Sequence, residues 1–384
     1  ELKGILESKS KRMEIIKEEL LEVKEKYGEE RRTEIIKDFT TLSIEDMIAE
    51  EEMVLTITHN GYIKRTSLST YRSQRRGGRG VQGASSRDED FVEHLFVANT
   101  HSYILFFTDK GKCYWVKVYD IPEGGRAAKG RAIVNLIGCE ADEKVSAFIS
   151  VKEFNEDHFV VMATEKGIVK KTKLSAYSNP RKKGIYAVEI RDGDRLIEAR
   201  VSTGDNDILL GTRNGKSIRF SEEQIRPSGR KTMGVKGITL SSEDDRLVGM
   251  LLIKREGTTV LVATEKGFGK RTEISQYRAQ KRGGKGVLTM KTTKKVGKMV
   301  TIKEVVDKDD LMIITNQGVL IRQPVAQIRA IGRATQGVKL IKLGEGTLVS
   351  SITRIMTEEE GGDDNSPEEV NNENNNPKTE EATS

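Results

Sequence analysis

The chain has 384 residues, enough for two or more domains of ordinary size. Of these residues 36% are hydrophobic, which permits a hydrophobic core, and only 5% are aromatic, which predicts a core with few large side chains. Its net charge of +6 hides an uneven distribution: residues 357–384 carry about −9, residues 1–40 about −1, and the stretch between them about +16, which predicts a polyanion-binding middle region. No apolar run approaches the ~20 residues that a membrane helix needs and no signal-peptide pattern opens the chain, so a membrane helix is not expected and a cytoplasmic location is.

The first forty residues predict helix. Apolar residues recur at alternating spacings of three and four, the pattern of a coiled coil or a long helical hairpin. They are Met13, Ile16, Leu20, Val23 and Tyr27. Gly28 marks the expected end of this helix, and a second short helical stretch is predicted at residues 29–39. We interpret residues 1–40 as a helical connector, expected to be part of a longer polypeptide because the first residue is Glu.

The middle of the chain repeats six times with a period of 48 to 56 residues. Each repeat contains an apolar run, a tight turn with a Thr three residues before a Gly, and a second run that ends in basic residues. The turn pairs are Thr58 and Gly61, Thr108 and Gly111, Thr164 and Gly167, Thr212 and Gly215, Thr264 and Gly267, and Thr315 and Gly318. About four strands per repeat predict an all-β ring of six blades over residues 44–356, with a linear β array as the alternative.

A basic, glycine-bearing loop follows each hairpin. The candidate DNA-binding residues of the first and fifth loops form two similar boxes: Gln74, Arg75, Arg76, Gly77, Gly78, Arg79 and Gly80, and Gln280, Lys281, Arg282, Gly283, Gly284, Lys285 and Gly286. Those of the other loops are Arg126, Lys129, Arg131, Arg181, Lys182, Lys183, Arg230, Lys231, Lys236, Arg329, Arg333 and Lys339. If the repeats form a ring, equivalent loops lie at equivalent places on its rim, and the cations form a band.

A curved basic band favours a bent duplex, because Lys and Arg release counterions wherever they meet phosphates. Glycines allow close backbone approach, and arginines supply forked donors. Since no recognition helix stands out, we expect binding through backbone charge and DNA deformability, with little base readout.

Other interpretations of the same residues are weaker. The string GRGVQG at residues 78–83 matches a dinucleotide-binding pattern but lacks a βαβ context. A disordered RGG-type tether is disfavoured because the loops recur in register with the repeats, although solvated turns without a partner remain an alternative. A protein-interaction propeller is a competing function, but its Trp-Asp signatures are absent from a chain whose single Trp, Trp115, precedes Val116.

Catalytic and metal-binding constellations are not expected. The chain has two cysteines, Cys113 and Cys139, too far apart for a CxxC pair and expected to be reduced packing residues. The four histidines, His59, His94, His101 and His158, share no metal-ligand spacing. The acid pairs at 244–245 and 309–310 are interpreted as solvated turn residues.

With these features in place, the chain resembles the C-terminal domain of the DNA gyrase A protein, one of the bacterial type II topoisomerases. Residues 74–80, QRRGGRG, match the family's signature box QRRGGKG with Arg79 in place of Lys, and YGEERRTEI resembles the segment that precedes the domain. The likeness covers nearly everything except residues 357–384. The second copy of the box, at residues 280–286, is a departure from the family pattern, and we expect it to be a second DNA anchor.

The resemblance implies a six-bladed β-pinwheel, related to the propeller but with its own strand arrangement, that wraps duplex DNA with a fixed hand so that gyrase can introduce negative supercoils. It implies a box that holds DNA in the first blade and helps to close the ring against the last. The C-terminal domain of topoisomerase IV is the related alternative. The resemblance further implies that this chain has no catalytic residue and no cofactor, and that ATP and Mg act on the gyrase B protein in an A2B2 holoenzyme. Separately, the acidic, Asn-rich composition of residues 357–384 predicts a disordered tail, for which a solubilising end and a competitor of DNA for the basic rim are the two alternatives.

Overall fold

The computed structural model describes residues 2–29, 33, 44–58, 60–67, 92–125, 128–140, 142–254, 257–317 and 320–355. The chain divides into two compact units, Glu1–Met47 and Ile48–Ser384. The stretch predicted as a second helix, the first basic box and the acidic tail lie outside the described residues, apart from Glu29 and Thr33 in the first of them.

The first unit contains the predicted helix as α1 (Leu2–Glu7) and α2 (Lys9–Tyr27), followed by a 3-10 turn, η1 (Ile44–Met47). The Ser8 hydroxyl accepts a hydrogen bond from the Lys11 backbone N–H and caps the start of α2. At the other end the Gly28 N–H donates to the Lys24 carbonyl. No residue of either helix is buried, so the apolar seam from Met13 to Tyr27 is exposed.

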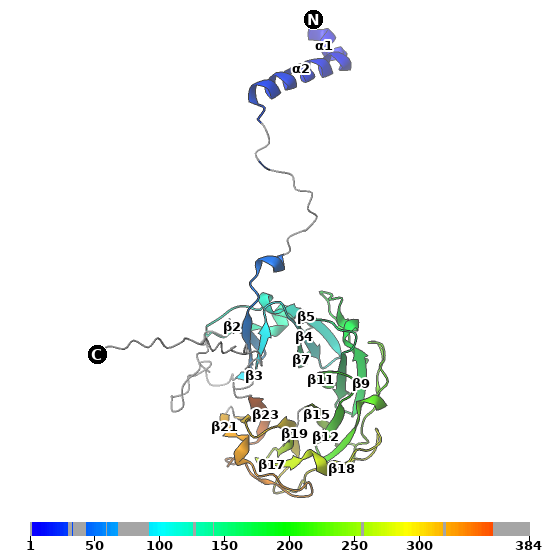
Figure 1. Cartoon of the computed structure of the whole chain (residues 1–384), viewed down its shortest axis with the longest axis vertical. Helices are drawn as coiled ribbons and strands as arrows, with labels where there is room; N and C mark the ends of the chain where they lie inside the picture. Colours follow the sequence, from blue (N-terminus) through cyan, green and yellow to red (C-terminus); the bar gives the residue numbers. More distant parts are fainter. Residues whose placement is uncertain are drawn as a thin grey trace, which may run out of the picture. The chain divides into compact units, whose positions relative to one another are not determined.

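The second unit forms six antiparallel sheets among the described residues, five of four strands and one of three, which confirms the six-bladed ring (Figure 1). From the inner to the outer edge, blade 1 contains β3 (Val92–Asn99), β1 (Glu52–Thr58), β2 (Tyr62–Ser67) and β6 (Arg131–Ala132), and blade 2 contains β7 (Val145–Val151), β4 (Tyr103–Thr108), β5 (Lys112–Lys117) and β10 (Ile185–Tyr186). Blade 3 contains β11 (Leu196–Ser202), β8 (Phe159–Thr164), β9 (Ile168–Lys173) and β14 (Val235–Lys236), and blade 4 contains β15 (Leu247–Ile253), β12 (Asp207–Thr212), β13 (Lys216–Ser221) and β18 (Val287–Leu288). Blade 5 contains β19 (Met299–Val305), β16 (Thr259–Thr264), β17 (Phe268–Glu273) and β22 (Val338–Lys339), and blade 6 contains β23 (Val349–Ile355), β20 (Asp310–Thr315) and β21 (Leu320–Pro324).

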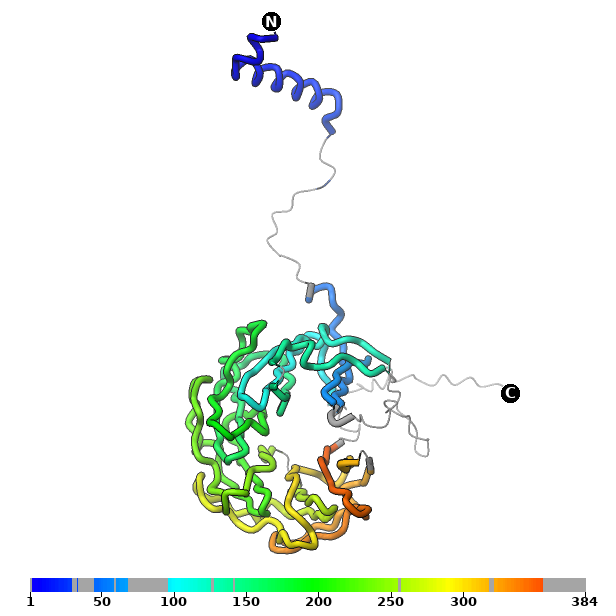
Figure 2. The backbone as a smooth tube through the Cα atoms, turned by 180° about the vertical axis from the view of Figure 1, so that it is seen from behind, coloured from blue at the N-terminus to red at the C-terminus, as the bar shows by residue number. Residues whose placement is uncertain are grey.

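Each short outer strand belongs to the repeat that follows its blade. For example, β18 lies in the fifth repeat but pairs with β13 of blade 4, where Lys216 faces Leu288. The sequence had assigned four strands to each repeat without showing this exchange. Because every exchanged strand crosses from one sheet to the next, the chain itself joins neighbouring blades around the ring (Figure 2).

In the first five repeats the threonine closes the hairpin turn, because its carbonyl accepts the N–H of the turn Gly, as in Thr58 and Gly61 at 2.9 Å. In the first four repeats its hydroxyl accepts a backbone hydrogen bond from the residue that follows the turn Gly, as in Thr58 from Tyr62 at 3.1 Å. Gly61 has φ of +74°, a left-handed conformation that costs Gly least. The sixth turn glycine, Gly318, lies outside the described residues.

The core lies between neighbouring blades. Leu105 and Phe107 of blade 2 pack with Val160 and Met162 of blade 3, and all four are at most 1% exposed. Short 3-10 turns follow the hairpins: η3 (Val118–Asp120), η4 (Leu174–Tyr177), η5 (Glu222–Gln224), η6 (Ile274–Gln276) and η7 (Val325–Gln327). Three of them, η3, η4 and η7, add buried apolar side chains to the core, namely Val118, Leu174, Tyr177 and Val325. A short helix, α3 (Ile133–Ile137), buries two isoleucines against blade 1. Apolar burial of this kind contributes roughly 25 cal/mol per Å².

Both cysteines are free thiols, as predicted, and Cys113 is fully buried in the core between blades 2 and 3. The expectation for the acid pairs was wrong in part, because Asp245 and Asp309 are each only 4% exposed. Asp245 accepts hydrogen bonds from the backbone N–H groups of Asn214, Ser241 and Arg246 and so holds two turns together. No helix in the described residues is long and apolar enough to span a bilayer.

Candidate nucleic-acid interface

The basic loops lie at the outer edge of the ring because each carries an exchanged outer strand. We call the segments 121–132, 178–186, 225–236, 277–288 and 328–339 the rim loops of repeats two to six. The strands β14, β18 and β22 are edge strands of their sheets, and in Figure 1 β18 lies on the perimeter of the ring, whereas β7, β11, β15, β19 and β23 surround the centre. The ring therefore carries the described cations of repeats two to six at its outer edge.

The structure sorts the predicted site residues into three groups. Exposed residues are Lys129, Arg131, Arg181, Lys182, Lys183, Lys231, Lys236, Lys281, Lys285, Arg329 and Lys339. Half-buried residues are Arg230, Gln280, Arg282, Gly283, Gly284, Gly286 and Arg333. The first box, Gln74 to Gly80, and Arg126 lie outside the described residues. The exposed cations of the rim are those available to a polyanion.

The second box, residues 280–286, lies within the described ring, and its three cations have different surroundings. Arg282 donates from Nη1 to the Lys236 carbonyl at 2.8 Å and from Nε to the Gln224 carbonyl at 3.2 Å. In contrast, the exposed ammonium groups of Lys281 and Lys285 make no hydrogen bond or ion pair with the described part of the chain. The sequence had grouped these three cations as equivalent DNA contacts.

The glycines of the rim loops permit close approach to the neighbouring blade. Gly286 has φ of +69°, and a Cβ placed on it would lie 2.4 Å from the Ser217 carbonyl oxygen. Gly130 has φ of +81°, and its Cβ would lie 2.4 Å from the Ile63 carbonyl oxygen. A side chain at either position would thus displace the exchanged outer strand. The packing of the ring therefore requires Gly at these two positions whether or not a ligand binds.

Three lysines that were not among the predicted site residues anchor the rim loops from inside. Lys64, Lys170 and Lys270 occupy the same place in β2, β9 and β17, and they are at most 3% exposed. Lys270 donates to the Gly332 carbonyl at 2.7 Å, to the Arg333 carbonyl, and to the Thr335 hydroxyl at 3.1 Å. Lys170 donates to the Arg230 carbonyl and, at 2.7 Å, to the Ala187 carbonyl.

The sequence signal for these lysines is the recurring string Lys, Lys or Arg, Thr in the first, third and fifth repeats. These basic strand ends belong to the hairpin pattern predicted from the sequence, and nothing in that pattern indicates that they anchor loops. Burial lowers the pKa of both Lys170 and Lys270 from 10.5 to about 8, with a nearby arginine acting in the same direction. These lysines therefore serve the interface by fixing its loops, since they do not reach solvent.

Replacing Lys270 by methionine should destabilise the fold, and more so at about pH 9.5 than at pH 7. Methionine leaves the Gly332 and Arg333 carbonyls without their donor, at a cost of about 1–3 kcal/mol. An unfolded lysine keeps its ordinary pKa, so between pH 8 and 10.5 the unfolded wild-type chain binds more protons than the folded one, and wild-type stability rises with pH. The variant lacks this rise.

Urea denaturation of wild type and variant at the two pH values measures the difference. Lys266→Met is the matched control, because Lys266 is exposed on the preceding turn and donates to the Lys294 carbonyl only. An equal loss for Lys270→Met at both pH values would contradict the lowered pKa.

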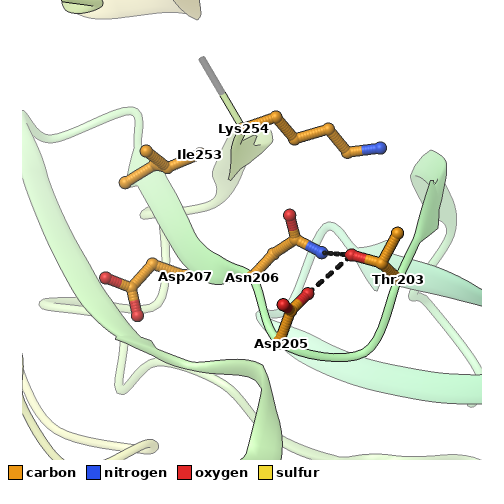
Figure 3. Close-up of a pocket in the computed structure, with 6 residues that line it drawn as sticks. All are labelled: Thr203, Asp205, Asn206, Asp207, Ile253 and Lys254. Atoms are coloured by element: carbon orange, nitrogen blue, oxygen red, sulfur yellow. Dashed lines mark hydrogen bonds between the residues drawn. The ribbon is translucent and has the colours of Figure 1, made fainter. Parts of the chain in front are cut away.

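A depression near the start of blade 4 differs from the basic rim in the charge of the residues that line it. Thr203, Asp205, Asn206, Asp207, Ile253 and Lys254 line it (Figure 3). The Thr203 hydroxyl donates to Asp205 at 2.6 Å and accepts from Asn206 at 3.0 Å, and the first of these bonds lowers the pKa of Asp205. Two carboxylates, of Asp205 and Asp207, outnumber the single ammonium group of Lys254 in this depression, so it is not a binding site for a polyanion. No cluster of possible metal ligands occurs within the described ranges.

Comparison with known proteins matches the ring to a family. The model of the DNA gyrase C-terminal domain, a beta-propeller, matches residues 52–99, 102–152, 158–203, 206–254, 258–305 and 309–355, one segment for each repeat. The DNA gyrase A protein of Staphylococcus epidermidis is 47% identical over 362 residues, which cover 94% of this chain and 40% of that protein. The DNA gyrase A protein of Staphylococcus aureus is 46% identical over 358 residues, covering 92% of this chain and 40% of the relative.

Solved structures agree on the architecture. The C-terminal domain of DNA topoisomerase IV superposes with a TM-score of 0.70 at 27% identity, covering 81% of this chain and 95% of that one. A DNA gyrase A C-terminal domain superposes with a TM-score of 0.65 at 24% identity, covering 80% and 100%, and shows the fold. The chain spans about 40% of the length of the curated relatives it matches.

Proposed function

Because the chain belongs to the DNA gyrase C-terminal domain family, we propose that its rim binds duplex DNA and wraps it with a fixed hand. The observation that carries this proposal is the series of exposed cations in equivalent rim loops on successive blades. A duplex bound to several of these loops must follow the curve of the ring. The counterions released at each phosphate contact provide free energy against bending, which costs of order 1–6 kcal/mol for 20–30 base pairs.

The wrapped segment would serve a larger enzyme. We propose that the domain presents DNA to a gyrase holoenzyme, in an A2B2 assembly whose gyrase B protein uses ATP and Mg, acting on DNA in the cytoplasm. The ring itself is the non-catalytic domain of the family, so strand cleavage and passage fall to other parts. The signature box at residues 74–80 favours gyrase over the related topoisomerase IV domain, and we propose that it holds DNA at the first blade and helps to close the ring.

A change in linking number tests the proposal. Relaxed circular plasmid is incubated with this chain, a nicking-closing topoisomerase is added, the protein is removed and the topoisomers are resolved. We expect a positive shift that grows with protein concentration. DNA binding without any shift would refute wrapping and leave a rim that only holds DNA, whereas no binding at all would favour a protein-interaction scaffold.

A further inference from the structure

The rim loops are joined in series by backbone hydrogen bonds. At three successive junctions, the residue shortly after one outer strand donates its N–H to a carbonyl of the next rim loop. These bonds run from Glu189 to Thr232 at 3.1 Å, from Thr239 to Gly284 at 2.9 Å, and from Lys291 to Thr335 at 3.0 Å. The loops of repeats three to six therefore form one connected belt.

An arginine reinforces two of these junctions in the same way. Arg282 reaches back to the carbonyl of Lys236, and Arg333 reaches back to the carbonyl of Leu288 at 3.1 Å. Each acceptor is the last residue of the preceding outer strand. A glutamine from the 3-10 turn completes each junction, because Gln224 and Gln276 accept the backbone N–H groups of Arg282 and Arg333 at 2.8 and 3.3 Å.

We propose that Arg282 and Arg333 are positioning residues that fix the distance and angle between successive DNA-binding loops. The proposal rests on the proposed function of the rim. Arg282 is half-buried and its guanidinium donates to Lys236 in the neighbouring rim loop and to Gln224 in the 3-10 turn before that loop. In contrast, Lys281 and Lys285 on either side of it are exposed. DNA contact thus belongs to the two lysines, and curvature depends on the arginine.

A lysine cannot replace the arginine in this task. The planar guanidinium of Arg282 donates to two carbonyls at once from Nε and Nη1, while an ammonium group on a flexible stem offers a single point charge. Arg282→Lys keeps the charge of the rim but releases the junction. Loops that move relative to one another still attract the phosphates of DNA. They no longer hold the duplex, which is stiff, to one curved path around the ring.

Three measurements on the whole chain separate positioning from binding. For the double variant Arg282→Lys/Arg333→Lys, we expect amide exchange at residues 280–286 and 331–337 to quicken about tenfold in the absence of DNA. The salt dependence of DNA binding should stay within about one ion of wild type. The linking-number shift per bound protein, measured at saturation, should fall to less than half.

The matched variant Lys281→Ala/Lys285→Ala should do the reverse. Losing two phosphate contacts lowers the slope of log affinity against log salt by about 1.8, while amide exchange in the loops stays as in wild type. Gln224→Ala/Gln276→Ala removes the glutamine acceptors without touching any cation, and it should reproduce the loss of linking-number shift even if the arginine variant folds poorly.

A double arginine variant with wild-type amide exchange, or with the full linking-number shift at saturation, would overturn the positioning role. A wild-type chain that binds DNA without any shift would instead overturn the proposed function and the wrapping role with it. The two failures are distinguishable, because the exchange measurement uses no DNA.

Discussion

Alanine at Lys231, Lys236, Lys281 and Lys285 is expected to weaken DNA binding roughly a hundredfold to a thousandfold at about 0.1 M salt. All four side chains are exposed in the rim loops of repeats four and five. Each phosphate contact releases nearly one counterion, so four lost contacts lower the slope of log affinity against log salt by about 3.6. Fluorescence anisotropy with a labelled duplex over a series of salt concentrations measures both quantities.

The control variant removes four positive charges from the helix α2 instead of from the rim. Lys9, Lys11, Lys17 and Lys24 are exposed on α2, and their replacement by alanine lowers the net charge equally. If binding depends on the rim, this variant should keep nearly the wild-type affinity and slope. Equal losses in the two variants would show that net charge, and not the rim, governs binding.

Glu222→Ala is expected to lower the free energy of unfolding by about 3–5 kcal/mol. Glu222 lies in η5 after blade 4 and is fully buried, and its Oε1 lies 2.9 Å from Nζ of Lys171 in blade 3. It also accepts hydrogen bonds from the Ser202 hydroxyl and, at 3.3 Å, from the Asn206 backbone N–H. The substitution leaves a buried ammonium group without its counter-ion at a junction between blades.

Urea denaturation followed by the fluorescence of Trp115 measures the loss. The pair Lys152 and Glu50 is the control, because its side chains are 67% and 51% exposed and Glu50→Ala should lower the free energy of unfolding far less than Glu222→Ala. The double variant Lys171→Met/Glu222→Leu removes both charges and should be more stable than Glu222→Ala alone. A loss below about 1 kcal/mol for Glu222→Ala would mean that the ion pair does not hold the blades together.

Much of the ring could be predicted because hairpins are encoded locally. A Thr such as Thr164 closes its own turn, with its hydroxyl 3.2 Å from the Ile168 backbone N–H, and Gly167 supplies the positive φ of that turn. Repetition of this local signal along the chain indicated six units, and neighbouring sheets bury each other's faces. The sequence also placed the cations of repeats two to six in the loops that the structure shows at the rim.

The roles of individual cations could not be predicted in the same way. Alternation along β17 would place Lys270 and Arg271 on opposite faces with one of them in solvent, yet they are 0% and 7% exposed. Both are buried because neighbouring blades cover both faces of blade 5. Their hydrogen bonds go to carbonyls of the rim loop of repeat six, about sixty residues further along the chain. Nothing within one repeat specifies those acceptors.

The number of repeats, the turns that define them and the loops that carry charge could all be inferred from the sequence, because these features depend on residues close together in the chain. The assembled ring was needed to show which repeat supplies each outer strand, and that Lys281 is exposed whereas Arg282 holds the neighbouring loop. The physical reason is that the bonding partners of a side chain at a blade junction come from a different repeat. Two cations adjacent in one box therefore have different roles once the ring is assembled.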